Sequence, residues 1–328
     1  MKKYLFETIF YFLLPLTFIA VVAEYSIRKI PNDYAYKSKW MQEHSNEIQT
    51  LCLGPSSVFY DINPVYFSEK GFNAAHVSQS IKYDHFIFNK FLPQMDALQN
   101  VIIGIDYWSP YGTMEESAEW WRVKYYHIHY ACDYHKKEKK YNYELYFHNA
   151  GVFGIAFKGL LNLLKLREET HLTVNEYGYG ENYTLSNRTA DWDEGKPEAL
   201  RHNQLISESV SLNKITENKA YIEDICKKSA EHGIRVFLIN TPLRPSYYNN
   251  LTPEFLAEGK EFSSSFAREF KNVSYLDFST DDRFSEEDFY DSIHLNETGS
   301  KKFTLLMDSI MLNNNNTHQL ITKTEFNK

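Results

Sequence analysis

The stretch "LCLGPSSVFYDINP", Leu51 to Pro64, is the most informative part of the sequence. Its first residues continue an apolar run from Ile48 that stops at Gly54, which predicts a short buried strand ended by a turn. A proline and two serines follow, and then an aromatic segment that closes with Asn-Pro. Two explanations fit hydroxyl groups at this place: a serine-rich turn, or a nucleophile held at the end of a strand.

Apolar segments of strand length recur along the chain and alternate with segments of helical periodicity. Predicted strands cover residues 48–54, 71–78, 100–108, 234–242 and 273–279, and predicted helices cover residues 79–92, 211–232, 262–270 and 296–312. This alternation indicates an α/β fold with a mostly parallel five-stranded sheet covered by helices on both faces. Such sheets bind ligands beyond the carboxyl ends of their strands.

Residues 113–205 interrupt the alternation and are crowded with Tyr, Trp, His and Lys. They include the apolar helical stretch "GVFGIAFKGLLNLLKL" (151–166) and the Gly/Tyr-rich loop "NEYGYGENYTLSNRT" (175–189). We interpret this region as an insertion or cap. Its aromatic rings either stack on sugar faces above the site, or pack the insertion's own core or lie near a membrane surface.

The amino-terminal segment has the length and composition of a membrane span. Tyr4 to Ala23 contain one charge, Glu7, and a helix of this length reaches roughly 30 Å, the thickness of the hydrocarbon layer. We therefore expect a single-pass anchor within residues 1–30. A cleaved signal peptide and a buried core helix are the alternatives.

Basic residues flank this segment on both sides. Lys2 and Lys3 favour a cytoplasmic amino end and an extracytoplasmic body, at the periplasmic face or the cell surface, whereas Arg28 and Lys29 oppose that orientation. We expect residues 31–315 to form one α/β domain that carries the insertion, and residues 316–328 to form a flexible tail.

Composition excludes several classes of protein. The chain of 328 residues is 43% hydrophobic and 16% aromatic, which excludes a disordered protein, and its net charge of −8 argues against nucleic-acid binding. The three cysteines, Cys52, Cys132 and Cys226, are too far apart for a CxxC metal site. We expect core thiols at Cys52 and Cys226, although one disulfide remains open. We predict neither a metal nor a cofactor.

The stretch "FYDSIHLNETGSKKFT", Phe289 to Thr304, carries the residue types that would activate a serine. A serine nucleophile needs a base within hydrogen-bond reach, and the base needs an orienting partner. Asp291 and His294 are spaced so that, on a tight turn, the carboxylate meets Nδ1 of the imidazole. Nε2 is then free to take a proton from a serine.

With Gly54-Pro55-Ser56 after the first strand and Asp291 three residues before His294, the sequence resembles the SGNH/GDSL hydrolase superfamily. It is most similar to an envelope-associated branch with an amino-terminal membrane segment. The resemblance covers about residues 45–112 and 210–312. It implies Ser56 as nucleophile, His294 as base, Asp291 as orienter and a flavodoxin-like three-layer α/β/α sandwich. Ser57 is the rival nucleophile.

Two blocks of that family pattern are altered here. In "NAAHVSQS" (73–80), Ser78 replaces the usual Gly, and the resemblance implies that its amide joins that of Ser56 as an oxyanion donor, each worth about 3 kcal/mol. The usual Asn of a later block is missing from "GIDYW" (104–108). Its place as a donor is open among Asn73, Gln79 and Trp108. Asp106 and Trp108 are candidates for substrate binding, with strand capping as the alternative for Asp106.

The resemblance implies a membrane-anchored, extracytoplasmic serine esterase or O-acyltransferase. The expected substrate is an acyl ester, with acetyl as the acyl group, on a cell-envelope polysaccharide, and envelope polysaccharide machinery is an expected partner. An inactive scaffold or glycan-binding protein in envelope assembly is the alternative, because two blocks deviate from the pattern. A lipid-directed esterase is a third possibility.

Overall fold

The computed structural model describes residues 4, 7–135, 138–147, 151–168, 170–209 and 214–313. The expected tail at 316–328 and the start of the helix expected from residue 211 lie outside this part. The chain divides into an N-terminal unit, Met1–Lys39 with Trp120–Leu172, and a sheet unit, Trp40–Glu119 with Thr173–Lys328. Each unit is described by itself.

The sheet unit contains five parallel strands in the order β2-β1-β3-β4-β5. They are β1 (Thr50–Leu53), β2 (Gly71–Asn73), β3 (Asn100–Gly104), β4 (Arg235–Asn240) and β5 (Val273–Asp277). The residues of β1 and β3 are buried, as expected for strands covered on both faces. This strand order is flavodoxin-like. From β1 the chain first adds β2 on one side and then β3, β4 and β5 on the other, so the strand order reverses between β1 and β3.

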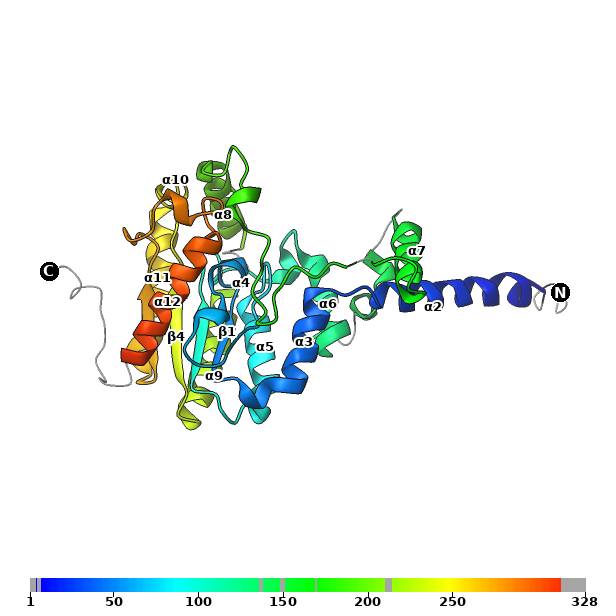
Figure 1. The fold of residues 1–328 in the computed structure, drawn as a ribbon, viewed down its shortest axis with the longest axis horizontal. Helices are drawn as coiled ribbons and strands as arrows, with labels where there is room; N and C mark the ends of the chain where they lie inside the picture. The colour runs from blue at the N-terminus through cyan, green and yellow to red at the C-terminus, as the bar shows by residue number, and fades with distance from the viewer. Residues whose placement is uncertain are drawn as a thin grey trace. The chain divides into compact units, whose positions relative to one another are not determined.

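Helices cover the sheet and complete a three-layer α/β/α sandwich, which confirms the predicted fold class (Figure 1). One group packs together as α5, α9 and α11, and α4 packs against α12. Their bounds are α4 (Ser56–Asp61), α5 (Ile81–Phe91), α9 (Lys214–Glu231), α11 (Pro253–Glu269) and α12 (Glu297–Asn313). The apolar periodicity explains the packing, since α9 buries Ile222, Ile225 and Cys226 on one side.

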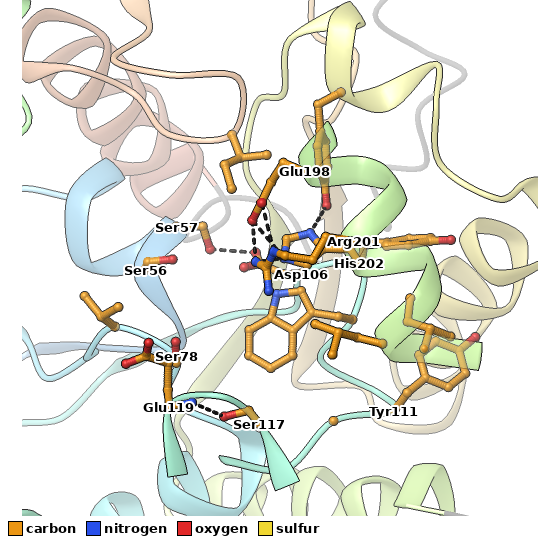
Figure 2. Close-up of a pocket in the computed structure, with 18 of the residues that line it drawn as sticks. Ser56, Ser57, Ser78, Asp106, Tyr111, Ser117, Glu119, Glu198, Arg201 and His202 are labelled. Atoms are coloured by element: carbon orange, nitrogen blue, oxygen red, sulfur yellow. Dashed lines mark hydrogen bonds and ion pairs between the residues drawn. The ribbon is translucent and has the colours of Figure 1, made fainter. Parts of the chain in front are cut away.

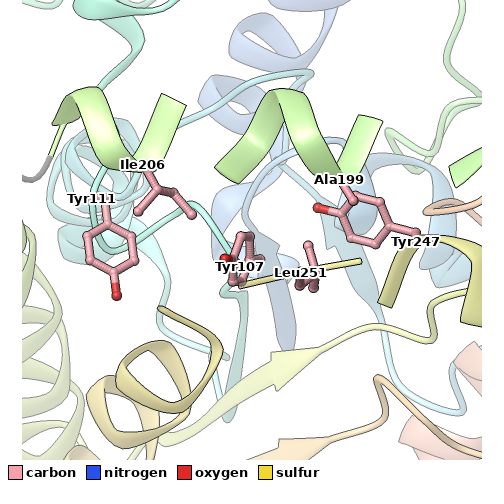
Figure 3. Packing of buried hydrophobic residues seen from close by; sticks show 6 residues of the cluster. All are labelled: Tyr107, Tyr111, Ala199, Ile206, Tyr247 and Leu251. Atoms are coloured by element: carbon pink, nitrogen blue, oxygen red, sulfur yellow. The ribbon is translucent and has the colours of Figure 1, made fainter. Parts of the chain in front are cut away.

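The region predicted as one insertion, 113–205, is divided between the two units. Trp120–Leu172 belongs to the N-terminal unit, whereas the chain from Thr173 returns to the sheet unit. There α8 (Gly195–Ser209) packs beside α10 (Pro245–Tyr248). Figure 3 shows the apolar cluster that holds α8 in place, formed by Tyr107, Tyr111, Ala199, Ile206, Tyr247 and Leu251.

The N-terminal unit begins with one continuous helical segment. A π-helical stretch, Ile9–Leu13, leads into α2 (Leu14–Arg28), and Ile9–Arg28 together are long and apolar enough to cross a membrane. The unit also contains α6 (Val123–Tyr130) and α7 (Val152–Leu163), and α3 (Asp33–His44) leads from it into the sheet unit.

Candidate active site

Ser56 is the first residue of α4 and follows β1 after a sharp turn. Gly54 makes this turn with φ +135°, and a Cβ there would lie 2.9 Å from Val58 Cγ2 and 3.0 Å from the Gly104 amide nitrogen. Only glycine accommodates both the backbone angle and the close approach of β3. The turn therefore presents Ser56 at the carboxyl end of β1, beside the point where the strand order reverses.

The structure brings Ser56, His294 and Asp291 together in the predicted arrangement. Nε2 of His294 lies 2.9 Å from Ser56 Oγ, and Nδ1 lies 3.0 and 2.9 Å from the two carboxylate oxygens of Asp291. Asp291 Oδ1 also accepts the amide N–H groups of Ile293 and His294, at 2.9 and 2.8 Å. The tight turn thus fixes both the carboxylate and the imidazole. This is the hydrogen-bond chain of a nucleophile, a base and an orienting group.

Aromatic rings enclose His294. The rings of Tyr60 and Tyr183 meet the imidazole edge to face, with centroids at 5.6 and 5.2 Å. Tyr183 stacks between Tyr60 and Tyr290. Sequence reasoning predicted an ordered Gly/Tyr loop around Tyr183 but gave it no role in the site, because nothing in the local sequence shows what the loop packs against.

Opposing effects set the pKa of His294. Burial disfavours the imidazolium, but the charges of Asp291, Asp61 and Asp106 and the hydrogen bond to Asp291 outweigh it and raise the pKa to about 9. Burial would raise the pKa of Asp291, yet the charge of His294 and the hydrogen bonds from its ring and two amides hold it below its usual range. The pair is therefore a strong base supported by an ionised carboxylate.

Asp61, at the end of α4, is a further residue of the site that sequence reasoning missed. Its Oδ1 accepts the amide N–H of Leu295 at 2.8 Å, directly after the base. Burial raises the pKa of Asp61 well above its usual range, and within the described part of the chain its Oδ2 has no hydrogen-bond partner. Asp61 fixes the position of the loop that carries His294.

The rival nucleophile, Ser57, has a different partner. Its Oγ donates a hydrogen bond to Asp106 Oδ1 at 2.6 Å (Figure 2). The Asp106 amide donates to Ser109 Oγ at 3.0 Å. Burial raises the pKa of Asp106 above its usual value. The hydrogen-bond pattern separates the two serines, since Ser56 faces the base and Ser57 faces a carboxyl group.

Ser78 has backbone geometry that supports its predicted role. Its φ of 60° is uncommon for a residue other than glycine, and it lines the same cavity as Ser56. Among the described residues, the amides of Ser56 and Ser78 have no hydrogen-bond partner. Both are therefore available to an anionic oxygen in the cavity.

The prediction of Asn73 as an oxyanion donor is wrong. Its Nδ2 donates to the carbonyl oxygens of Val58 and Ile62, each at 2.8 Å, and its Oδ1 accepts the Ala75 amide at 3.0 Å. Both amide protons are used to hold α4 against β2, and the residue is fully buried. Gln79 is also engaged, since its Nε2 donates to Asp84 Oδ1 at 2.6 Å. Trp108 is the remaining alternative that lines the cavity.

The cavity beside Ser56 has a volume of about 360 Å³, within the range of small-molecule sites. Asp106 and Trp108 line it, where sequence reasoning placed substrate-binding residues. Residues from α8 form another wall, which sequence reasoning did not identify: Glu198, Arg201 and His202 (Figure 2). The helical spacing of Glu198 and Arg201 in "EALRH" was the available signal.

The α8 wall is ordered by its own polar contacts. Arg201 Nε donates to Glu198 Oε2 at 2.9 Å, and Nη2 binds the other carboxylate oxygen. Nδ1 of His202 lies 2.6 Å from the Tyr247 hydroxyl, and burial lowers the pKa of His202 to about 4. Near neutral pH this wall therefore presents an ion pair and an uncharged imidazole.

Comparison with models of known protein families gives no match, and comparison with curated protein sequences gives no match either. Within the described ranges, no group of three or more His, Cys, Asp or Glu side chains is placed to hold a metal ion. Cys52, Cys132 and Cys226 are buried free thiols.

Proposed function

We propose that this protein is a membrane-anchored serine enzyme of the SGNH/GDSL type. It would hydrolyse an acyl ester or transfer the acyl group, with acetyl as that group and a cell-envelope polysaccharide as the substrate. The observation that carries the proposal is the 2.9 Å contact between Ser56 Oγ and His294 Nε2, continued by Asp291 on Nδ1. The segment Ile9–Arg28 supports a membrane anchor, and an extracytoplasmic position of the sheet unit is part of the proposal.

The reaction follows from this geometry. Neutral His294 takes the Ser56 proton at Nε2 while Oγ attacks the acyl carbonyl carbon. The amides of Ser56 and Ser78 stabilise the resulting oxyanion, and the C–O bond to the leaving alcohol breaks as His294 returns the proton to that oxygen. An acyl-Ser56 ester remains. His294 then deprotonates water or a sugar hydroxyl as that oxygen attacks the acyl carbon. The acyl carbon–Oγ bond breaks, and His294 returns the proton to Ser56 Oγ.

The cavity walls support a polar, ring-containing substrate. Trp108, Tyr107 and Tyr111 supply aromatic surface, and the Glu198–Arg201 pair supplies hydrogen-bonding groups on α8. A combination of apolar walls and few fixed polar groups is typical of sites that orient a small ligand. Hydrolysis and transfer differ only in whether water or a sugar hydroxyl enters this cavity at the second step.

A fluorophosphonate probe tests the proposal directly, because it reacts with activated serines. The detergent-solubilised full chain should be labelled at Ser56, and Ser56→Ala should abolish labelling. Ser57→Ala is the matched control and should still be labelled. If the wild type resists the probe and hydrolyses no acetyl ester, the enzyme proposal fails and an inactive scaffold takes its place.

A further inference from the structure

Helix α7 has an apolar side that the N-terminal unit leaves uncovered. Phe153 and Phe157 are 77% and 59% exposed, and Leu164, directly after the helix, is 56% exposed. Their spacing places these side chains on one side of the helix. Such a surface on a water-soluble unit is unfavourable, and it marks a place where an apolar environment is expected.

The opposite side of α7 packs tightly against the end of α2. A Cβ on Gly159 would lie 2.5 Å from the carbonyl oxygen of Ser26, so only glycine permits this approach. Ser26 and Ile27 are buried in this contact region, whereas Leu16 and Phe18, earlier in α2, are exposed. In Figure 1, α7 lies beside the carboxyl-terminal part of α2. The position of α7 along the span is therefore fixed.

Polar side chains lie at the end of the apolar segment of α2, close to where α7 packs. Glu24 accepts the amide N–H groups of Glu144 and Leu145 at 3.1 and 3.0 Å, and Arg28 Nε donates to Glu24 at 2.6 Å. Next to these contacts, Tyr25, Tyr143 and Tyr146 are exposed. Exposed tyrosines beside charged residues are typical of the boundary between lipid headgroups and acyl chains.

We propose that α7 is an interfacial helix whose Phe153, Phe157 and Leu164 insert into the lipid bilayer at the headgroup–acyl boundary. The inference rests on the proposed membrane anchor, because α7 packs against α2 at Ser26, near the end of the apolar segment. Lys165 and Arg167, just beyond the helix, supply cations for lipid phosphates. Through its contact with Ser26, α7 would restrict how deeply α2 sits and how the N-terminal unit is oriented on the membrane.

Depth-dependent quenching tests this in the full chain. Single replacements Phe153→Cys and Phe157→Cys are labelled with a fluorophore in phosphatidylcholine vesicles that contain a nitroxide lipid, labelled either near the headgroup or deep in the acyl chain. Phe18→Cys in α2 reports on the anchor, and Leu305→Cys, an exposed apolar position on α12, is the matched control. The native cysteines are buried, and unsubstituted protein measures any background labelling.

We expect the shallow nitroxide to quench both α7 positions several-fold more than position 305, and the deep nitroxide to quench position 18 most. Quenching at position 18 without quenching at 153 and 157 would leave the anchor intact and overturn the inference about α7. Absence of quenching at position 18 would overturn both. If the labels at 153 and 157 are not quenched but lie close to the same labels in a second copy of the chain, the α7 surface would be a self-association site instead.

Discussion

Ser56 and Ser57 are neighbours in the chain after β1, and each belongs to a hydrogen-bonded group that includes a carboxyl, but the two groups are built differently. Ser56 Oγ lies 2.9 Å from His294 Nε2, and the carboxylate of Asp291 contacts the other ring nitrogen, Nδ1. Ser57 contacts the carboxyl of Asp106 directly, at 2.6 Å. A carboxylate has a much lower proton affinity than an imidazole whose pKa is about 9. Only the first serine therefore has a partner strong enough to take its proton.

The carboxyl groups of this region also show how pairing competes with burial. Burial alone raises the pKa of each of them, and it prevails at Asp61 and Asp106. At Asp291 the adjacent imidazolium and the two amide donors reverse the direction. Neighbouring carboxyl groups therefore have pKa values shifted in opposite directions, and substitutions can test this contrast in order of expected effect.

The largest effect should follow from Asp291→Asn. The amide would donate to Nδ1, which places the imidazole proton on Nε2 and removes the acceptor for the Ser56 proton. We expect the rate of acetyl-ester hydrolysis at pH 7 to fall by about 10³- to 10⁴-fold, as in other serine triads. Initial rates of p-nitrophenyl acetate hydrolysis measure this, with the exposed Asp282→Asn as control. A loss below about tenfold would argue against Asp291 as the orienting group.

A smaller effect is expected on the pH dependence of the hydrolysis rate when Asp106 is replaced. The base must be neutral to accept a proton. A group with a pKa of about 9 is mostly protonated at pH 7, and its neutral fraction grows with pH, so the rate should rise towards a plateau above about 9. Asp106→Asn removes one of the charges that raise this pKa, so the rising limb should move to lower pH, by less than about one unit. Asn keeps an oxygen acceptor for Ser57. Rate profiles between pH 5 and 10, in roughly half-unit steps, measure both proteins. An unchanged limb would mean that Asp106 is already neutral where His294 titrates.

The sequence predicts some parts of this molecule much better than others. The strands follow from apolar runs such as residues 48–54, because local pattern determines them, and their parallel direction follows from the alternation of strands with helices. The contact between Asp291 and His294 follows from their spacing on one turn, whereas Ser56 as their partner was what the family resemblance implied. Tyr183 and Arg201 were missed because residues 173–205 reach the site only through long-range packing, such as that of α8. Asn73 was misassigned because its hydrogen-bond partners are carbonyl groups of α4 and the following residue.

The smallest effect is expected from Ser57→Ala, and it tests whether the second pair is structural. Asp106 would lose the donor on Oδ1 in a buried position, which costs about 1–3 kcal/mol of folding stability. Hydrolysis should stay within about tenfold of wild type, because neither Ser56 nor His294 loses a contact. Thermal unfolding and initial rates measure both, with the exposed Ser309→Ala as control.

The double variant Ser57→Ala/Asp106→Ala sharpens this last test, because each single replacement removes the hydrogen bond between the two side chains. If the two side chains act mainly through each other, their effects on stability should be non-additive by about 1 kcal/mol. Additive effects would mean that the 2.6 Å contact contributes little. A loss of activity in Ser57→Ala as large as that of Ser56→Ala would instead place Ser57 in the chemistry. That result would remove the distinction between the two serines. Ser57 would then have to contact His294, although its hydroxyl now donates its hydrogen bond to Asp106.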